Sequence, residues 1–184
     1  MFQINDTVMY GIHGVCKIED ITMKEFMGSQ KEYYVLKPIN DLTATLYVPI
    51  HNEKLLAKMR RILSKQEVYQ LIETMPQKEA IWFKNENERK EQYKQVIAKG
   101  NHSELIGMIK AIYLHKQKRE SEGKHLYISD ERFFKEAERI LYEEFQYVLD
   151  IKKEDLLPLI LSKIGEQEYE NPWYTTDQAA VADK

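Results

Sequence analysis

Short runs of β-branched and aromatic residues alternate with turns through the first 50 residues. Each run has the length of a strand, and each gap contains Gly, Ser, Asn or Asp, which is typical of strands joined by tight connections. The runs cover residues 7–10, 15–21, 33–38 and 43–49. Because four or five short strands are too few for a large sandwich, the pattern predicts a small, strongly bent barrel of the SH3 or Tudor kind.

After Pro49 the apolar residues follow the spacing of helices. Ser64 and Glu67 form a capping box, which predicts a helix from residue 64 to about 75, where Pro76 ends it. Ser129, followed by two acidic residues, predicts another N-terminus. The remaining helices are predicted over residues 79–99, 101–123, 129–148 and 153–164.

These patterns predict an α+β protein of two domains. Residues 1–55 form the SH3/Tudor-like β-barrel, and residues 60–166 form an all-α helical bundle. The joint lies between Ile50 and Arg61. Residues 167–184 lack periodicity and are expected to form a loose tail.

Charge is distributed unevenly along the chain. Residues 1–55 carry five basic and seven acidic side chains (net −2), residues 56–124 carry fifteen and nine (net +6), and residues 125–184 carry seven and fourteen (net −7). A basic middle segment indicates an anionic partner, although an ordinary mixed helical surface would give the same count.

Neither secretion nor catalysis is indicated. Cys16 is the single cysteine, the N-terminus lacks the pattern of a signal peptide, and no apolar run is long enough to span a membrane, so a cytoplasmic protein without a membrane partner is expected. The five histidines show no metal-ligand spacing, and nucleophile and phosphate-loop motifs are missing. We therefore expect no enzyme, cofactor, metal or small-molecule substrate, with an unrecognised enzyme as the reserve hypothesis.

Four segments together resemble one family. Residues 2–15, FQINDTVMYGIHGV, resemble the start of CarD-type bacterial transcription regulators, in which such a run opens a Tudor-like barrel shared with the polymerase-interacting module of transcription-repair coupling factor. Residues 28–36 resemble the next hairpin, residues 46–49 the last strand, and residues 89–100 the first long C-terminal helix. The resemblance covers residues 1 to about 150.

This resemblance implies a function without catalysis. Family members bind the β subunit lobe of RNA polymerase through the barrel, and their helical domain contacts promoter DNA at the upstream edge of the bubble. A Trp enters the minor groove there and helps to keep the open complex open. The polymerase-binding positions fall on Lys24, Phe26 and Tyr47, where many relatives have Arg, Ile and Arg, so the charge is kept at Lys24 and lost at Tyr47.

The DNA-binding half of the resemblance is less direct. Counted back from Gly100, the wedge position falls on Glu86, and Trp82 lies four residues earlier, one turn away on a helix. Trp82 is therefore either a DNA wedge or a core residue. The candidate phosphate contacts are Lys84, Arg89, Lys90, Lys94, Lys99 and Lys110. Acidic residues interrupt them, so DNA affinity is expected to be weak unless polymerase delivers the protein to the promoter.

Two main hypotheses follow. The first is a transcription regulator that binds polymerase through the barrel and promoter DNA through the helices, stabilising the open complex. The second is an adaptor on RNA polymerase whose helical domain contacts protein and not DNA. Phosphate contacts would make binding fall steeply with salt, whereas an adaptor would show a shallow dependence.

Overall fold

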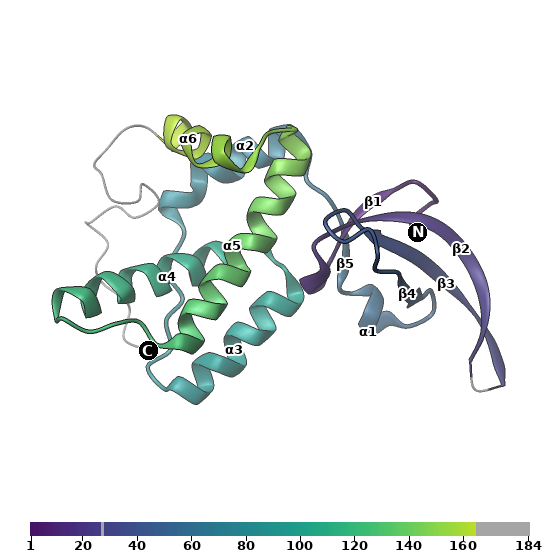
Figure 1. Cartoon of the computed structure of the whole chain (residues 1–184), viewed down its shortest axis with the longest axis horizontal. Coiled ribbons are helices and arrows are strands. Elements are labelled where there is room, and N and C mark those ends of the chain that lie inside the picture. Colours follow the sequence, from purple (N-terminus) through teal and green to yellow (C-terminus); the bar gives the residue numbers. More distant parts are fainter. Residues whose placement is uncertain (27, 165–184) are drawn as a thin grey trace. The chain divides into compact units, whose positions relative to one another are not determined.

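The computed structural model describes residues 1–26 and 28–164. The chain divides into two compact units, Met1–Ile62 and Leu63–Lys184. The first unit is an antiparallel sheet and the second is helical, which confirms the predicted α+β class (Figure 1). The predicted tail at 167–184 lies outside the described residues.

Five strands form the sheet of the first unit. They are β1 (Thr7–Tyr10), β2 (Val15–Phe26), β3 (Ser29–Pro38), β4 (Leu46–Pro49) and β5 (Met59–Arg61). Neighbours pair antiparallel in the order β4-β3-β2-β1-β5. The sheet is therefore bent and Tudor-like but open, with β4 and β5 as its two edges in the described part of the chain.

The long hairpin of β2 and β3 extends beyond the predicted runs (Figure 1). Its outer half is polar and lies outside the apolar core, so the hydrophobic pattern did not reveal it. The short helix α1 (Glu53–Leu56) and strand β5 were not predicted either. Because β5 pairs with β1, the sheet continues past residue 55, where the sequence pattern ended it.

The core of the sheet explains the imperfect alternation seen in the sequence of β2. Cys16 and Ile18 are buried in this core, and a register irregularity follows between Ile18 and Asp20. The extra residue, Glu19, changes which face the later positions point to, so Ile21 packs against the same core. Opposite Ile21, Tyr34 and Val48 continue the buried row across β3 and β4.

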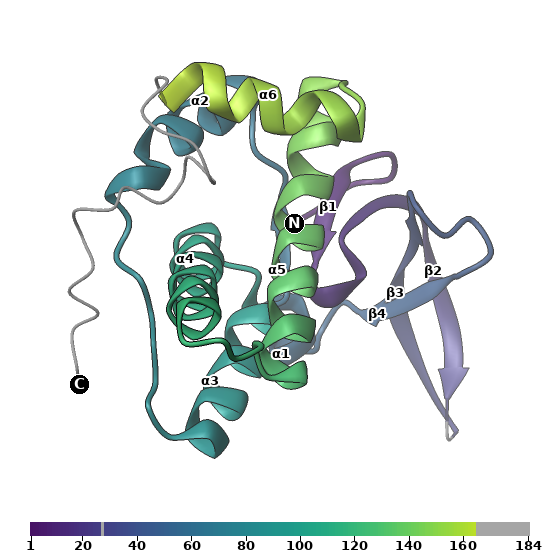
Figure 2. The same cartoon turned by 60° about the vertical axis from the view of Figure 1, so that its left-hand side comes forward.

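The second unit contains five helices in its described residues. They are α2 (Lys65–Thr74), α3 (Glu86–Lys99), α4 (His102–Ser121), α5 (Ile128–Leu149) and α6 (Lys153–Ile164). Figure 2 looks nearly along α4 and shows α5 on one side of it and the connection from α2 to α3 on the other. Residues 105–113 of α4 are buried without interruption, as expected for a helix that is surrounded by its neighbours.

Helix ends agree with the sequence where a local cap defines them. The Ser64–Glu67 capping box is present, Asn101 caps α4, and Gly100 ends α3 in the left-handed conformation. Two predicted starts were wrong. Helix α3 begins at Glu86 and not at residue 79, because the Asn85 side chain accepts from two backbone N–H groups.

The second error concerns α5. This helix begins at Ile128 after Tyr127, so Ser129 is not its N-cap. The backbone N–H of Glu131 donates to the Tyr127 carbonyl, and this is the first hydrogen bond of the helix. With Ser129 as the N-cap, the first such bond would lie two residues later.

Candidate functional site

The predicted polymerase contacts lie on one part of the sheet. Lys24 pairs with Lys31 across β2 and β3, and Val35 pairs with Tyr47 across β3 and β4. Directly paired residues share a face, and faces alternate along a strand. The face opposite the core therefore carries Lys24, Tyr33, Val35 and Tyr47. We call these four residues the outer sheet face.

Lys24 and Tyr47 are in contact although 23 residues separate them (47 − 24). The Lys24 Nζ lies 3.5 Å from the centroid of the Tyr47 ring, and the rings of Tyr33 and Tyr47 meet edge to face at 6.5 Å. Tyr47 remains 43% exposed. The third predicted residue, Phe26, ends β2, where its backbone pairs with Ser29. The outer sheet face thus offers a cation and two aromatic rings to a partner.

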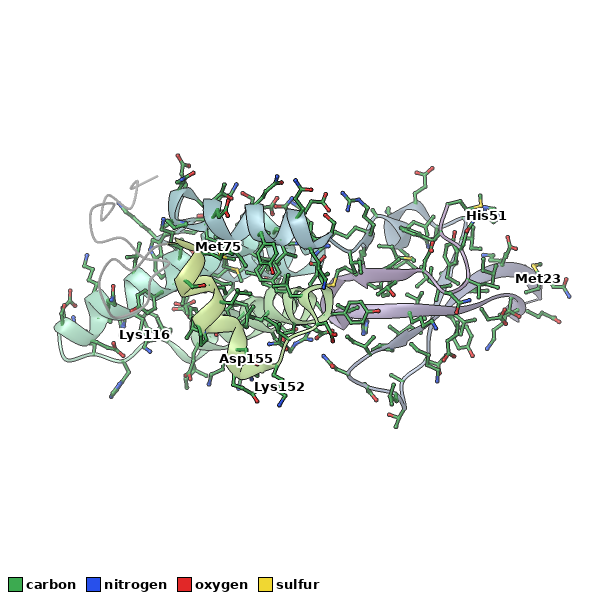
Figure 3. All side chains as sticks on the ribbon, turned by 90° about the horizontal axis from the view of Figure 1, so that it is seen from above. Met23, His51, Met75, Lys116, Lys152 and Asp155 are labelled. Atoms are coloured by element: carbon green, nitrogen blue, oxygen red, sulfur yellow. The ribbon has the colours of Figure 1, made fainter. Side chains whose placement is uncertain are left out.

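The surroundings of this face are also accessible. Strand β4, which carries Tyr47, is an edge of the sheet, and an edge strand can pair with a strand of another protein. Met23, which neighbours Lys24 and so points to the other face of the sheet, is exposed near the tip of the β2–β3 hairpin (Figure 3). A partner could therefore contact both side chains and backbone here.

Trp82 lies in the connection between α2 and α3, and not on the helix that was predicted to begin at residue 79. The backbone N–H of Ile81 donates to the Gly107 carbonyl of α4 (3.0 Å), and the Tyr93 hydroxyl of α3 donates to the Ile81 carbonyl (2.8 Å). A Cβ added at Gly107 would lie 2.6 Å from the Glu79 carbonyl oxygen. The connection is therefore packed directly on α4, at a glycine that permits this close approach.

The indole of Trp82 belongs to a packed cluster. It stacks on His115 of α4, with ring centroids 4.0 Å apart, and the Arg89 guanidinium lies 4.3 Å from the ring centroid. Arg89 is 2% exposed and binds Asp130 of α5 through two hydrogen bonds, of 3.1 and 2.9 Å. It also donates to the Phe83 carbonyl (2.9 Å). The Trp82 ring is thus held by α3 and α4, and Asp130 of α5 fixes the Arg89 side chain that lies over it.

Two predicted phosphate contacts do not fit their environment. Arg89 is buried in its pair with Asp130, and Lys110 is equally buried and donates to the carbonyls of Pro76 and Lys78. Burial lowers the pKa of Lys110. Both cations are bound to groups inside the helical unit, and neither is presented to a ligand on the surface.

The other predicted lysines are more accessible, but most of them face carboxylates. Lys90 pairs with Glu86, and Lys94 lies 2.7 Å from Glu91. Lys99 lies 3.6 Å from Glu104, and Lys84 is exposed. These pairs weaken the positive potential of α3, as the interrupting carboxylates in the sequence suggested.

His115 and Asp130 were missed as members of the Trp82 cluster. Asp130 was interpreted as a first-turn acid of its helix, because its partner Arg89 lies 41 residues away. His115 shows no motif in the sequence. Its Nε2 is buried without a hydrogen-bond partner, and burial, followed by the nearby Arg89 charge, lowers its pKa.

Comparison with known proteins assigns the first unit. Residues 2–63 match the family described as "CarD-like/TRCF RID domain". Over these residues the N-terminal unit is similar to this domain family. The match to the CarD-like/TRCF RID domain ends one residue past the boundary between the two units. The predicted resemblance is confirmed for these residues and stays a prediction for the helical unit.

A Bacillus subtilis (strain 168) protein named "Putative transcription factor YdeB" is 40% identical over 47 residues. That segment covers 25% of this chain and 31% of the relative, so less than a third of the relative's length is matched. The similarity therefore concerns one segment of each protein and does not extend to the whole of either.

Membrane spans and metal sites are two other features that the described residues can be compared with. Among the described residues, no helix combines the length and apolar character needed to cross a membrane. Within the same residues, His, Cys, Asp and Glu form no group of three that could hold a metal ion.

Proposed function

We propose that this protein is a transcription regulator that binds RNA polymerase through the outer sheet face of its N-terminal unit. The observation that carries the proposal is the match of residues 2–63 to the CarD-like/TRCF RID domain family. Lys24 and Tyr47, two of the predicted contact residues, touch each other on an exposed surface of that unit. The β subunit lobe is the proposed binding partner.

The chemistry of the outer sheet face suits a protein partner. An exposed aromatic ring beside a cation can bury apolar area while the ammonium group binds a carboxylate at the rim. Tyr47 lies where many family members have Arg, so the contact depends more on aromatic packing and less on charge. We expect Lys24 to supply the charged contact.

Capture of the polymerase β lobe by the full chain tests this proposal. Lys24→Glu combined with Phe26→Ala, and separately Tyr47→Ala, should reduce capture at least about tenfold, the loss typical of a central contact residue. Lys58→Glu is the matched control, because Lys58 is an exposed lysine of the same unit outside β2, β3 and β4. If the intact folded protein captures no polymerase, the proposal is wrong.

We further propose that the helical unit contacts promoter DNA and prolongs the open complex. The net positive segment at residues 56–124 supports this part, and delivery by polymerase would compensate for weak intrinsic affinity. The lifetime of the open complex, measured with and without the protein, tests it. A Trp82→Ala variant that leaves the lifetime unchanged would exclude Trp82 as the wedge.

The second candidate function is an adaptor on RNA polymerase that does not bind DNA. Its support is specific: Trp82 is stacked on His115, and Arg89 and Lys110 are buried. The salt dependence of promoter-complex binding separates the two functions, because each phosphate contact adds about 0.9 to the slope of log affinity against log salt. If the salt slope measured with the protein present is close to that of polymerase alone, the adaptor function is favoured.

A further inference from the structure

A basic groove lies at the corner where α4 turns into α5. It has a volume of about 600 Å³ and is lined by nine residues, of which three are cations and one is a carboxylate. The cations are Lys90, Arg119 and Lys124, and the carboxylate is Glu86. With His125 neutral, the lining carries a net charge of +2 (3 − 1). We call this groove the α4–α5 corner.

The connecting loop holds Arg119 in place. The Nε of Arg119 donates to the His125 carbonyl (2.6 Å), and the backbone N–H of Lys124 donates to the Arg119 carbonyl (2.8 Å). Gly123 has a φ of +73°, which allows the chain to turn between them. The guanidinium also lies 4.2 Å from the Tyr127 ring centroid. Arg119 is thus pre-organised beside an aromatic surface at little further entropic cost of binding.

The same corner exposes apolar side chains. Ile128 is 71% exposed, and Tyr127 beside it is also exposed. Ile128 is the first residue of the 22-residue helix α5, and Tyr127 is its N-cap, which makes no side-chain capping hydrogen bond. The dipole of that helix adds to the positive potential of the three cations.

The carboxylates near the groove reduce this positive potential without removing it. Glu86 pairs with Lys90, and Glu122 pairs with Lys124, and all four side chains are at least a third exposed. Exposed pairs of this kind are weak, so a phosphate can replace the carboxylate as the partner of the lysine. The hydrogen bond from Lys124, followed by the charges of Lys124, Lys118 and Arg119, lowers the pKa of Glu122.

We infer that the α4–α5 corner is the site at which this protein contacts the backbone of duplex DNA. Lys90, Arg119 and Lys124 bind phosphates, while Ile128 and Tyr127 contact the apolar edges of sugars and bases in a groove. Phosphate contacts with an adjoining apolar side chain are typical of proteins that bind DNA without reading its sequence. The inference rests on the DNA contact of the proposed function and assigns it to residues other than Trp82, whose ring is engaged with His115 and Arg89.

Binding of the full chain to a labelled 30-base-pair duplex, followed by fluorescence anisotropy at several salt concentrations, tests the site. Lys124→Glu should weaken binding about tenfold and lower the salt slope by about one, the value for one phosphate contact. Lys152→Glu is the matched control, since Lys152 is an exposed lysine of the same unit, at the start of α6 (Figure 3). It should leave the affinity unchanged.

The apolar contact has its own pair of variants. Ile128→Ser should weaken binding about threefold without changing the salt slope, because no phosphate contact is lost. Leu157→Ser is its control, as Leu157 is an exposed apolar residue on α6. Because both side chains are exposed, neither substitution should change the stability of the fold appreciably.

Three results would overturn the inference. The first is an unchanged affinity of Lys124→Glu for the duplex. The second is an equal loss of affinity in Lys152→Glu, which would mean that only diffuse charge matters. The third is that an acidic peptide of equal charge displaces the labelled duplex as effectively as unlabelled duplex does. Polymerase capture by the same variants separates this inference from the proposed function. Lys124→Glu should still capture polymerase. If the wild-type chain binds duplex through Lys124 but does not capture polymerase, only the polymerase proposal is refuted.

Discussion

The two units use the same interaction, a cation against an aromatic ring, in opposite environments. In the sheet, Lys24 lies 3.5 Å from the Tyr47 ring centroid on an exposed surface. In the helical unit, Arg89 lies 4.3 Å from the Trp82 ring centroid and is buried against Asp130. Such contacts contribute about 0.5–1 kcal/mol when exposed and about 2 kcal/mol or more when desolvated. The difference indicates that the first pair is available for recognition and the second stabilises a core.

The strongest test of this comparison removes the buried cation. Arg89→Ala leaves Asp130 charged and unpaired in the interior, so the free energy of unfolding should fall by about 3–5 kcal/mol in denaturant titration. The double variant Arg89→Met with Asp130→Leu should lose less, because neither charge remains. A loss below 1 kcal/mol for Arg89→Ala would show that the Arg89–Asp130 pair does not stabilise the folded unit.

A smaller effect is expected from the backbone contact that positions Trp82. Gly107→Ala would place its Cβ 2.6 Å from the Glu79 carbonyl oxygen, and relieving that clash should cost about 1–3 kcal/mol of stability. Ser103→Ala, at an exposed position of the same helix, is the control and should change stability by less than about 0.5 kcal/mol. Equal stability of both variants would mean that the connection moves freely on α4.

The pH dependence of stability sharpens the comparison further. His115 has a lowered pKa because it is buried and lies near Arg89, so the unfolded chain takes up a proton before the folded unit does. The free energy of unfolding should therefore be highest above about pH 6.5, the unperturbed value, and should fall as the pH drops below it.

His115→Gln removes this contribution, while the charged groups that surround position 115, namely Arg89, Lys118, Arg119 and Asp130, remain. The wild type should lose more stability between pH 7.5 and 5.5 than the variant does. Parallel curves for the two proteins would contradict the assigned role of His115.

The smallest effect on stability is expected at the exposed pair. Lys24→Gln and Tyr47→Phe should each change the free energy of unfolding by less than about 0.5 kcal/mol, because both side chains are accessible to water. Polymerase capture should nevertheless fall for Lys24→Gln. A variant that unfolds more easily and captures polymerase normally would reverse the roles assigned to the two cation–aromatic pairs.

Local features of the chain were predictable because their causes are local. Two helix starts are defined by hydrogen bonds within four residues, at Ser64 with Glu67 and at Asn101. One helix end is defined by the left-handed backbone of Gly100. The start of α3 was mistaken because the predicted helix was extended back to residue 79, whereas Asn85 caps the helix at its actual start. The outer half of the β2–β3 hairpin was missed because its residues are not buried.

The candidate sites were less predictable than the elements that carry them. The sequence alone determined the α+β division, the order of the main elements and the family resemblance of the first unit, since these follow from periodicity, caps and matched residues. Only the tertiary structure decided that Lys24 meets Tyr47, that Arg89 is buried against Asp130, and that Arg119 and Ile128 border one groove. The physical reason is that burial of a charge, and with it the choice between core and surface, depends on contacts between residues far apart in the chain.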